Sequence, residues 1–89
     1  MLKCPAEMQV AGVAETWHAW RSALDGGPQC VILDASELRT IDTAGLQMLV
    51  ATVGALREKA IPWRWESCSS QLADAIERLG LSELLGTLP

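Results

Sequence analysis

The sequence predicts an α/β fold: a small mixed sheet of three to four strands, with helices packed mainly on one face. Helical apolar patterns of ten or more residues alternate with short strand patterns along the chain. Such alternation is typical of strands that are joined by right-handed helical crossovers in a parallel or mixed sheet. The 89 residues suffice for one domain, residues 1–89, with a thin core.

The first predicted elements are a helix and a buried strand. The large apolar residues of the helical segment recur every three or four positions on one face, at Val10, Val13, Trp17, Trp20 and Leu24. The turn sequence DGGP at 25–28 ends this helix. The following run QCVILDA, at 29–35, contains the β-branched pair Val31 and Ile32. It predicts a central strand that is buried on both faces.

The second helix is predicted to begin near Asp42, because one apolar stripe follows from there. The stripe consists of Leu46, Leu49, Val50, Val53 and Leu56. The segment IPWRWES, at 61–67, then alternates apolar and polar residues with a period of two. This period predicts a strand with Trp63 and Trp65 on its core face, and Pro62 is typical of an edge strand or a strand's first residue.

The last predicted elements are two short helical segments. Ser69 or Ser70 can cap a third helix. The apolar stripe of that helix is Leu72, Ile76 and Leu79, and Gly80 closes it. The C-terminal LSELLGTLP predicts one more helical turn and a frayed end.

The composition restricts the classes of function. The net charge is -4, the pI is 4.8 and the seven basic residues are scattered, so no nucleic-acid interface is expected. No segment approaches the roughly 20 apolar residues that span a bilayer, so we expect no direct membrane insertion. Cys4, Cys30 and Cys68 fit neither a disulfide framework nor a zinc site. They are expected to be buried or half-buried thiols in a reducing cytoplasm.

Several residues could indicate catalysis, but each has a simpler explanation. His18 falls on the polar side of the first helix, where a solvated histidine is expected rather than a base. Asp34 and Asp42 bracket a loop, yet no His, Lys or third ligand is near them in the sequence. The phosphate-binding pattern GxxxxGK[ST] is absent. We therefore expect no catalytic residue, no cofactor and no metal.

The stretch LRTIDTAGLQML, at 38–49, places a hydroxyl at the start of the second helix. If Asp42 is the N-cap, its carboxylate can accept from the N–H of Ala44 or Gly45. Thr43 is then the first helical residue, beside N–H groups that lack helical partners. Two interpretations follow: a plain helix cap, or a hydroxyl displayed for modification or recognition. The small Ala44 and Gly45 allow another backbone to approach closely.

A phosphate on Thr43 would be favoured by the free N–H groups and the positive end of the helix dipole. Asp42 and Glu37 would oppose it. Phosphorylation would therefore turn a nearly neutral apolar edge into a strongly anionic one. Such a change suits a switch that breaks a contact.

The segments VILDASELRTIDTAGLQMLVATVGALREKAIPWRW and LADAIERLGLSELL resemble the sulphate transporter and anti-sigma-factor antagonist (STAS) domain. The resemblance covers about residues 29–85. The family's Asp-[Ser/Thr]-x-Gly-Leu motif stands here as Asp42, Thr43, Ala44, Gly45 and Leu46. The resemblance implies a small mixed sheet with helices on one side, and a regulatory domain that binds proteins.

The resemblance also implies roles for these residues. Thr43 is the expected phosphorylation site. The enzyme expected to modify it is a serine kinase that is also the anti-sigma factor. This kinase is expected to bind only the unphosphorylated form of the protein. Other branches of the family imply a constitutive subunit, bound to the ATPase of a phospholipid-transporting ABC complex or to a chemotaxis protein. A Thr in place of the commoner Ser favours those branches. The expected partner-binding residues are Ser36, Glu37, Thr40, Asp42, Thr43, Ala44, Gly45 and Leu46.

The N-terminus departs from the family pattern. In place of a hairpin reading Gly-Glu-Leu-Asp there is CPAEMQV, with Glu7 at the position of the Glu and Gln9 where the acid would stand. The first strand is expected to be missing or reduced to residues 2–4. One sheet edge would then be exposed, which favours a homodimer or a stable partner.

Overall fold

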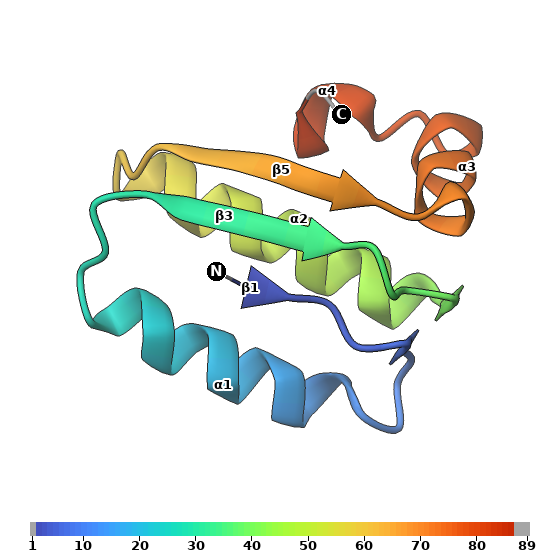
Figure 1. Cartoon of the computed structure of the whole chain (residues 1–89), viewed down its shortest axis with the longest axis horizontal. Coiled ribbons are helices and arrows are strands. Elements are labelled where there is room, and N and C mark those ends of the chain that lie inside the picture. Colours follow the sequence, from blue (N-terminus) through green and yellow to red (C-terminus); the bar gives the residue numbers. More distant parts are fainter. Residues whose placement is uncertain (1, 87–89) are drawn as a thin grey trace.

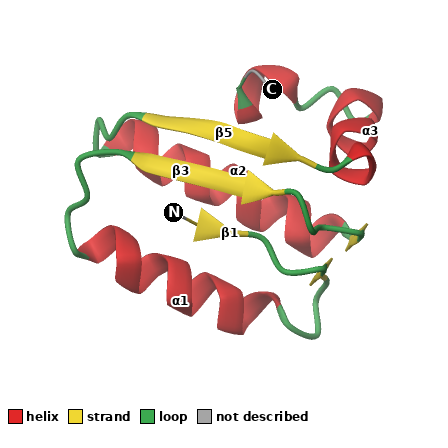
Figure 2. Ribbon diagram, in the orientation of Figure 1, coloured by secondary structure: helices red, strands yellow, loops and turns green. Residues whose placement is uncertain are grey.

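The computed structural model describes residues 2–86, which form an α/β structure (Figures 1 and 2). The strands are β1 (Leu2–Lys3), β2 (Glu7–Met8), β3 (Val31–Ala35), β4 (Thr40–Ile41) and β5 (Trp63–Cys68). The helices are α1 (Val13–Asp25), α2 (Thr43–Glu58), α3 (Ser70–Arg78) and α4 (Ser82–Leu85). The α/β fold with a small sheet is confirmed, as is a helical turn within LSELLGTLP; residues 87–89 of that segment lie outside the described part.

The main sheet has three strands in the order β1-β3-β5, and β2 pairs with β4 in a separate ribbon. Every one of these pairings is parallel. Parallel neighbours need a crossover connection, which α1 and α2 provide between successive strands of the main sheet. The predicted reduction of the first strand is seen in the two residues of β1.

The register of β3 and β5 contains a β-bulge. Leu33 lies opposite Trp65, but Asp34 lies opposite Ser67, so Glu66 is an extra residue in β5. A bulge of this kind bends the strand and increases its twist. It lies in β5, one of the two edge strands of the described main sheet.

The helices cover one face of the sheet. α2 packs against both α1 and α4, and Figure 1 shows α2 behind β3 and β5, with no described helix across the near face. Val31, Leu33 and Ala35 are buried against the helices, whereas Ile32 and Asp34 are only partly buried. The prediction that this strand is buried on both faces is therefore wrong, because no helix within residues 2–86 covers its second face.

The structure also revises single positions. α1 begins at Val13, and Val10 is 73% exposed because its backbone turns outside the helix. Leu79 follows the last residue of α3 and is 59% exposed, so it is not part of a buried stripe. Cys4 is buried and Cys68 half-buried as predicted, but Cys30 is exposed just before β3. His18 is exposed on α1, as the sequence indicated.

The tryptophans of β5 lie on the core face as predicted. Trp65 is buried and its Nε1–H donates to the carbonyl of Leu85 at 2.8 Å, which ties α4 to the sheet. Trp63 is half-buried, and the Arg57 guanidinium lies 5.7 Å from its ring centroid. Within residues 2–86, no helix has the length and apolar character needed to cross a membrane.

Candidate functional site

The start of α2 is organised by the carboxylate of Asp42. Its Oδ1 accepts from the N–H of Gly45 at 3.0 Å, which confirms the predicted N-cap. Its Oδ2 accepts from the N–H of Val10 at 2.9 Å, a bond that the sequence did not reveal. These bonds, first that from Gly45 and then that from Val10, lower the pKa of Asp42 below its ordinary value. The carboxylate is therefore ionised at neutral pH.

Thr43 is the first residue of α2, as predicted, and it is exposed. Its neighbour Ala44 is half-buried. Residues in the first helical turn have backbone N–H groups without i−4 partners. The Thr43 hydroxyl is thus displayed at the positive end of a helix of 16 residues.

Gly45 has a structural reason to be glycine. A Cβ at this position would overlap the carbonyl oxygen of Met8 and lie 2.8 Å from Cγ1 of Ile41. The backbone that approaches this glycine closely is therefore the chain's own β2. Gly45 is buried, and Leu46 is only 7% exposed. Both residues therefore belong to the packed interior beneath the exposed start of α2.

The remaining predicted partner-binding residues lie in the segment after β3. The N–H of Ser36 donates to Oδ1 of Asp34 at 2.9 Å, and this bond contributes most to the lowered pKa of that carboxylate. Glu37 forms an ion pair of 2.7 Å with Lys3, and Thr40 pairs with Glu7 between β4 and β2. Ser36, Glu37, Thr40 and Thr43 are exposed.

The carboxylate of Asp34 accepts from the N–H of Ser36, whereas that of Asp42 accepts from the N–H groups of Gly45 and Val10, so the two carboxylates share no partner. Across residues 2–86, no group of three or more His, Cys, Asp or Glu side chains is placed to hold a metal ion.

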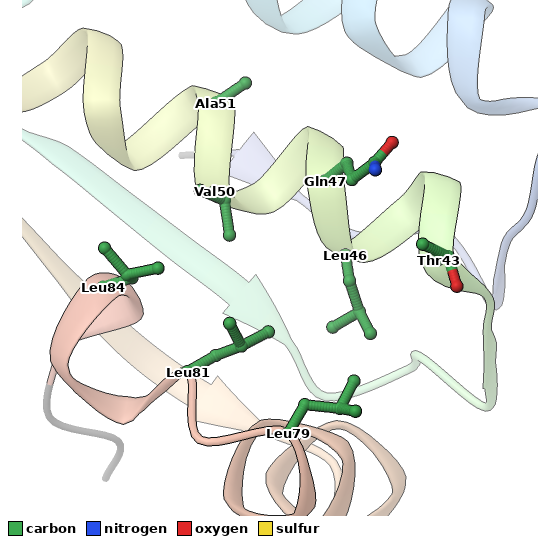
Figure 3. Close-up of a pocket in the computed structure, with 8 residues that line it drawn as sticks. All are labelled: Thr43, Leu46, Gln47, Val50, Ala51, Leu79, Leu81 and Leu84. Carbon is green, nitrogen blue, oxygen red and sulfur yellow. The ribbon is translucent and has the colours of Figure 1, made fainter.

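An apolar groove of about 410 Å³ begins at Thr43 (Figure 3). It runs between α2 and the segment that contains the end of α3 and α4. Its lining residues are Thr43, Leu46, Gln47, Val50, Ala51, Leu79, Leu81 and Leu84. Leu79 and Leu84 are 59% and 47% exposed, so the groove presents large apolar side chains to solvent. The sequence indicated Thr43 and Leu46. It missed the opposite wall, because its pattern places Leu79 in the buried stripe of the third helix and predicts only a helical turn from the leucines after Gly80.

The wall formed by α4 is fixed to the rest of the molecule. The guanidinium of Arg57 donates to the carbonyl of Glu83 at 3.2 Å and lies over the ring of Trp63. With the bond from Trp65 to Leu85, these contacts hold α4 beside α2. The groove is therefore formed before any ligand arrives.

The surface of α2 beside the groove carries no charge. Its exposed residues before the last turn are Thr43, Gln47, Ala51 and Gly54, and its first charged residue is Arg57. Exposed helix faces of soluble proteins usually carry charged residues. Depletion of charge around an apolar centre is typical of protein interfaces.

The geometry thus combines an exposed threonine, an apolar groove and an uncharged helix face. A comparison with protein families matches the STAS domain over residues 5–89, which includes all of these features. Comparisons with curated proteins and with solved structures give no match. The family match spans nearly the whole chain and includes the sequence from Asp42 to Leu46. This chain belongs to the STAS-domain family.

Proposed function

We propose that this protein is a non-catalytic regulatory domain that binds another protein through the groove and the start of α2, and that phosphorylation of Thr43 releases that partner. One observation carries the proposal: an exposed threonine at a helix N-terminus lies at the end of an exposed apolar groove. STAS domains are in general protein-interaction domains, which agrees with such a surface.

The groove explains binding in the unmodified state. Burying exposed apolar surface is favourable by about 25 cal/mol per Å². Leu79 and Leu84 offer such surface, and the uncharged face of α2 adds little desolvation cost. Because the groove walls are held in place, little conformational entropy is lost on binding.

A phosphate on Thr43 explains release. It adds a charge of about −1.5 to −2 at the end of the apolar surface. Asp42, ionised beside it, increases the negative potential. A partner that contacts this end would have to desolvate both charges, so its affinity would fall.

The phosphoryl transfer needs only an acceptor from this chain. The Thr43 oxygen attacks the γ-phosphorus of a nucleoside triphosphate held by a serine kinase, which in this proposal is the partner and anti-sigma factor. A new O–P bond forms, the bond to the bridging oxygen of the diphosphate breaks, and the hydroxyl proton passes to a base of the kinase. The proposal places the protein in the cytoplasm, where nucleoside triphosphates are available.

A second candidate function uses the same surface without modification. The apolar groove can also hold a permanent partner, such as the ATPase subunit of a phospholipid-transporting ABC complex or a chemotaxis protein. The groove fixed by Arg57 and Trp65 favours this role as much as the first. Self-association through the sheet edge at β1 stays a prediction beside both.

The test uses the partner complex recovered from native cells. Thr43→Glu is expected to weaken partner binding at least tenfold, corresponding to about 1.4 kcal/mol, whereas Thr43→Val keeps it. Intact-mass analysis should show phosphate at Thr43 only in partner-free protein. Equal affinity of Thr43→Glu and wild type, with wholly unmodified protein in a stoichiometric complex, would contradict the switch and favour the permanent subunit.

A further inference from the structure

The carboxylate of Asp42 joins two segments that are far apart in the sequence. One oxygen caps α2 through Gly45 and the other holds the N–H of Val10, which lies 32 residues upstream. The backbone N–H of Asp42 also donates to the carbonyl of Met8 at 3.2 Å. We name residues 9–12, between β2 and α1, the Val10 loop. The start of α2 and the Val10 loop therefore share one side chain.

The Val10 loop has few other restraints. Its backbone forms a turn in which the N–H groups of Gly12 and Val13 both donate to the carbonyl of Gln9 at 2.9 Å. α1 has no side-chain N-cap of its own, since Gly12 occupies that position. Within the described residues, Asp42 gives the one side-chain hydrogen bond that reaches the loop. The large apolar side chain of Val10 is 73% exposed on this loop.

We propose that Asp42 couples the modification state of Thr43 to the Val10 loop, so that a phosphoryl group on Thr43 loosens the loop. This inference rests on the proposed function and adds a regulatory step to it. Unmodified protein holds Val10 in a fixed position through the Asp42 carboxylate, and phosphorylated protein does not. Release of the partner then involves two changes: a new negative charge at the end of the groove and the loss of a fixed conformation in the Val10 loop.

The physical reason is competition at the start of α2. A phosphate on Thr43 is adjacent to the Asp42 carboxylate and repels it. It also seeks the same backbone N–H donors that Asp42 now uses. Both effects favour a carboxylate that turns outward to water. The N–H of Val10 then loses its acceptor and exchanges with solvent.

The test is amide hydrogen exchange, followed by NMR, on the isolated protein with no partner present. Thr43→Glu supplies the negative charge, and Thr43→Val is the uncharged control. Asp42→Asn keeps one side-chain acceptor, so it cannot hold both N–H groups. A lost bond to a charged acceptor should speed exchange of the Val10 amide by about tenfold in Thr43→Glu and Asp42→Asn. Exchange in Thr43→Val should equal that of wild type.

The Leu72 amide, which bonds to the Ser69 side chain at the start of α3, serves as the remote reference and should not change. Faster Val10 exchange in Asp42→Asn but not in Thr43→Glu would overturn the coupling. Unchanged exchange in both variants would show that the bond does not order the loop, and would overturn it as well. Since no partner is used, either result is distinct from a failure of the proposed partner switch.

Discussion

Gly45 and Asp42 show how single residues build this surface. Gly45 removes the side chain that would collide with β2, and Asp42 then fixes the same region with two hydrogen bonds. The motif residues were identifiable from the sequence because a cap and a glycine at a helix start form a local pattern. The contact of Gly45 with Met8 was not, since it joins residues 37 positions apart.

Replacement of Gly45 tests this packing. Gly45→Ala should destabilise the fold by about 1 to 3 kcal/mol, because the added methyl group overlaps the backbone carbonyl of Met8, which cannot move aside, and also crowds the side chain of Ile41. Gly54→Ala is the matched control: it lies in the same helix with nothing within 4 Å of an added Cβ, and should stabilise by about 0.5 to 1 kcal/mol. Urea unfolding measures both. Equal effects of the two substitutions would contradict the close contact at Gly45.

At the level of elements, the sequence predicted the helices and the longer strands because their periodicity extends over several residues. The two-residue strands β2 and β4 were not recognised, since two residues have no period. The groove also escaped prediction. It requires Leu79 and Leu84 to lie opposite α2, and that placement depends on tertiary contacts of α4 with Arg57 and Trp65.

The groove wall can be tested through its exposed leucines. Leu79→Ser and Leu84→Ser should each weaken partner binding about tenfold, because apolar contact area in the groove is lost. Both side chains are exposed, so the urea midpoint should change little. Ala23→Ser, exposed on α1 away from the groove, is the control in titration calorimetry with the purified partner. Undiminished affinity in both leucine variants would place the partner elsewhere.

At the level of the whole molecule, two carboxylates hold connecting segments around the sheet in place through hydrogen bonds. Asp34 closes the turn after β3, and Asp42 links the Val10 loop to α2. Backbone hydrogen bonds lower the pKa of both groups, chiefly through Ser36 at Asp34 and Gly45 at Asp42. The stability of the fold thus depends on two ionised carboxylates, one at the turn after β3 and one at the start of α2.

Acid should therefore weaken the fold. A carboxylate whose pKa is lowered by folding stabilises the folded state at pH values above its unfolded-state pKa of about 3.8. This stabilisation is lost as the pH falls through the folded-state pKa. The urea midpoint should be flat from pH 7 to about pH 5 and should fall below pH 4. Asp42→Asn should reduce that fall, since one of the two carboxylates whose pKa is lowered by folding is absent. An identical acid dependence in this variant would show that Asp42 does not contribute.

The bulge in β5 has a consequence for the protein at high concentration. A flat outer strand with free N–H and C=O groups is a template on which further chains add to form fibrils. β5 combines Pro62 before its first residue, the exposed charges of Arg64 and Glu66, and a backbone bent by the extra residue. Incoming strands would meet charge and an irregular hydrogen-bonding edge. Growth of fibrils from the β5 edge of the sheet is therefore disfavoured, even though the protein exposes an apolar groove elsewhere on its surface.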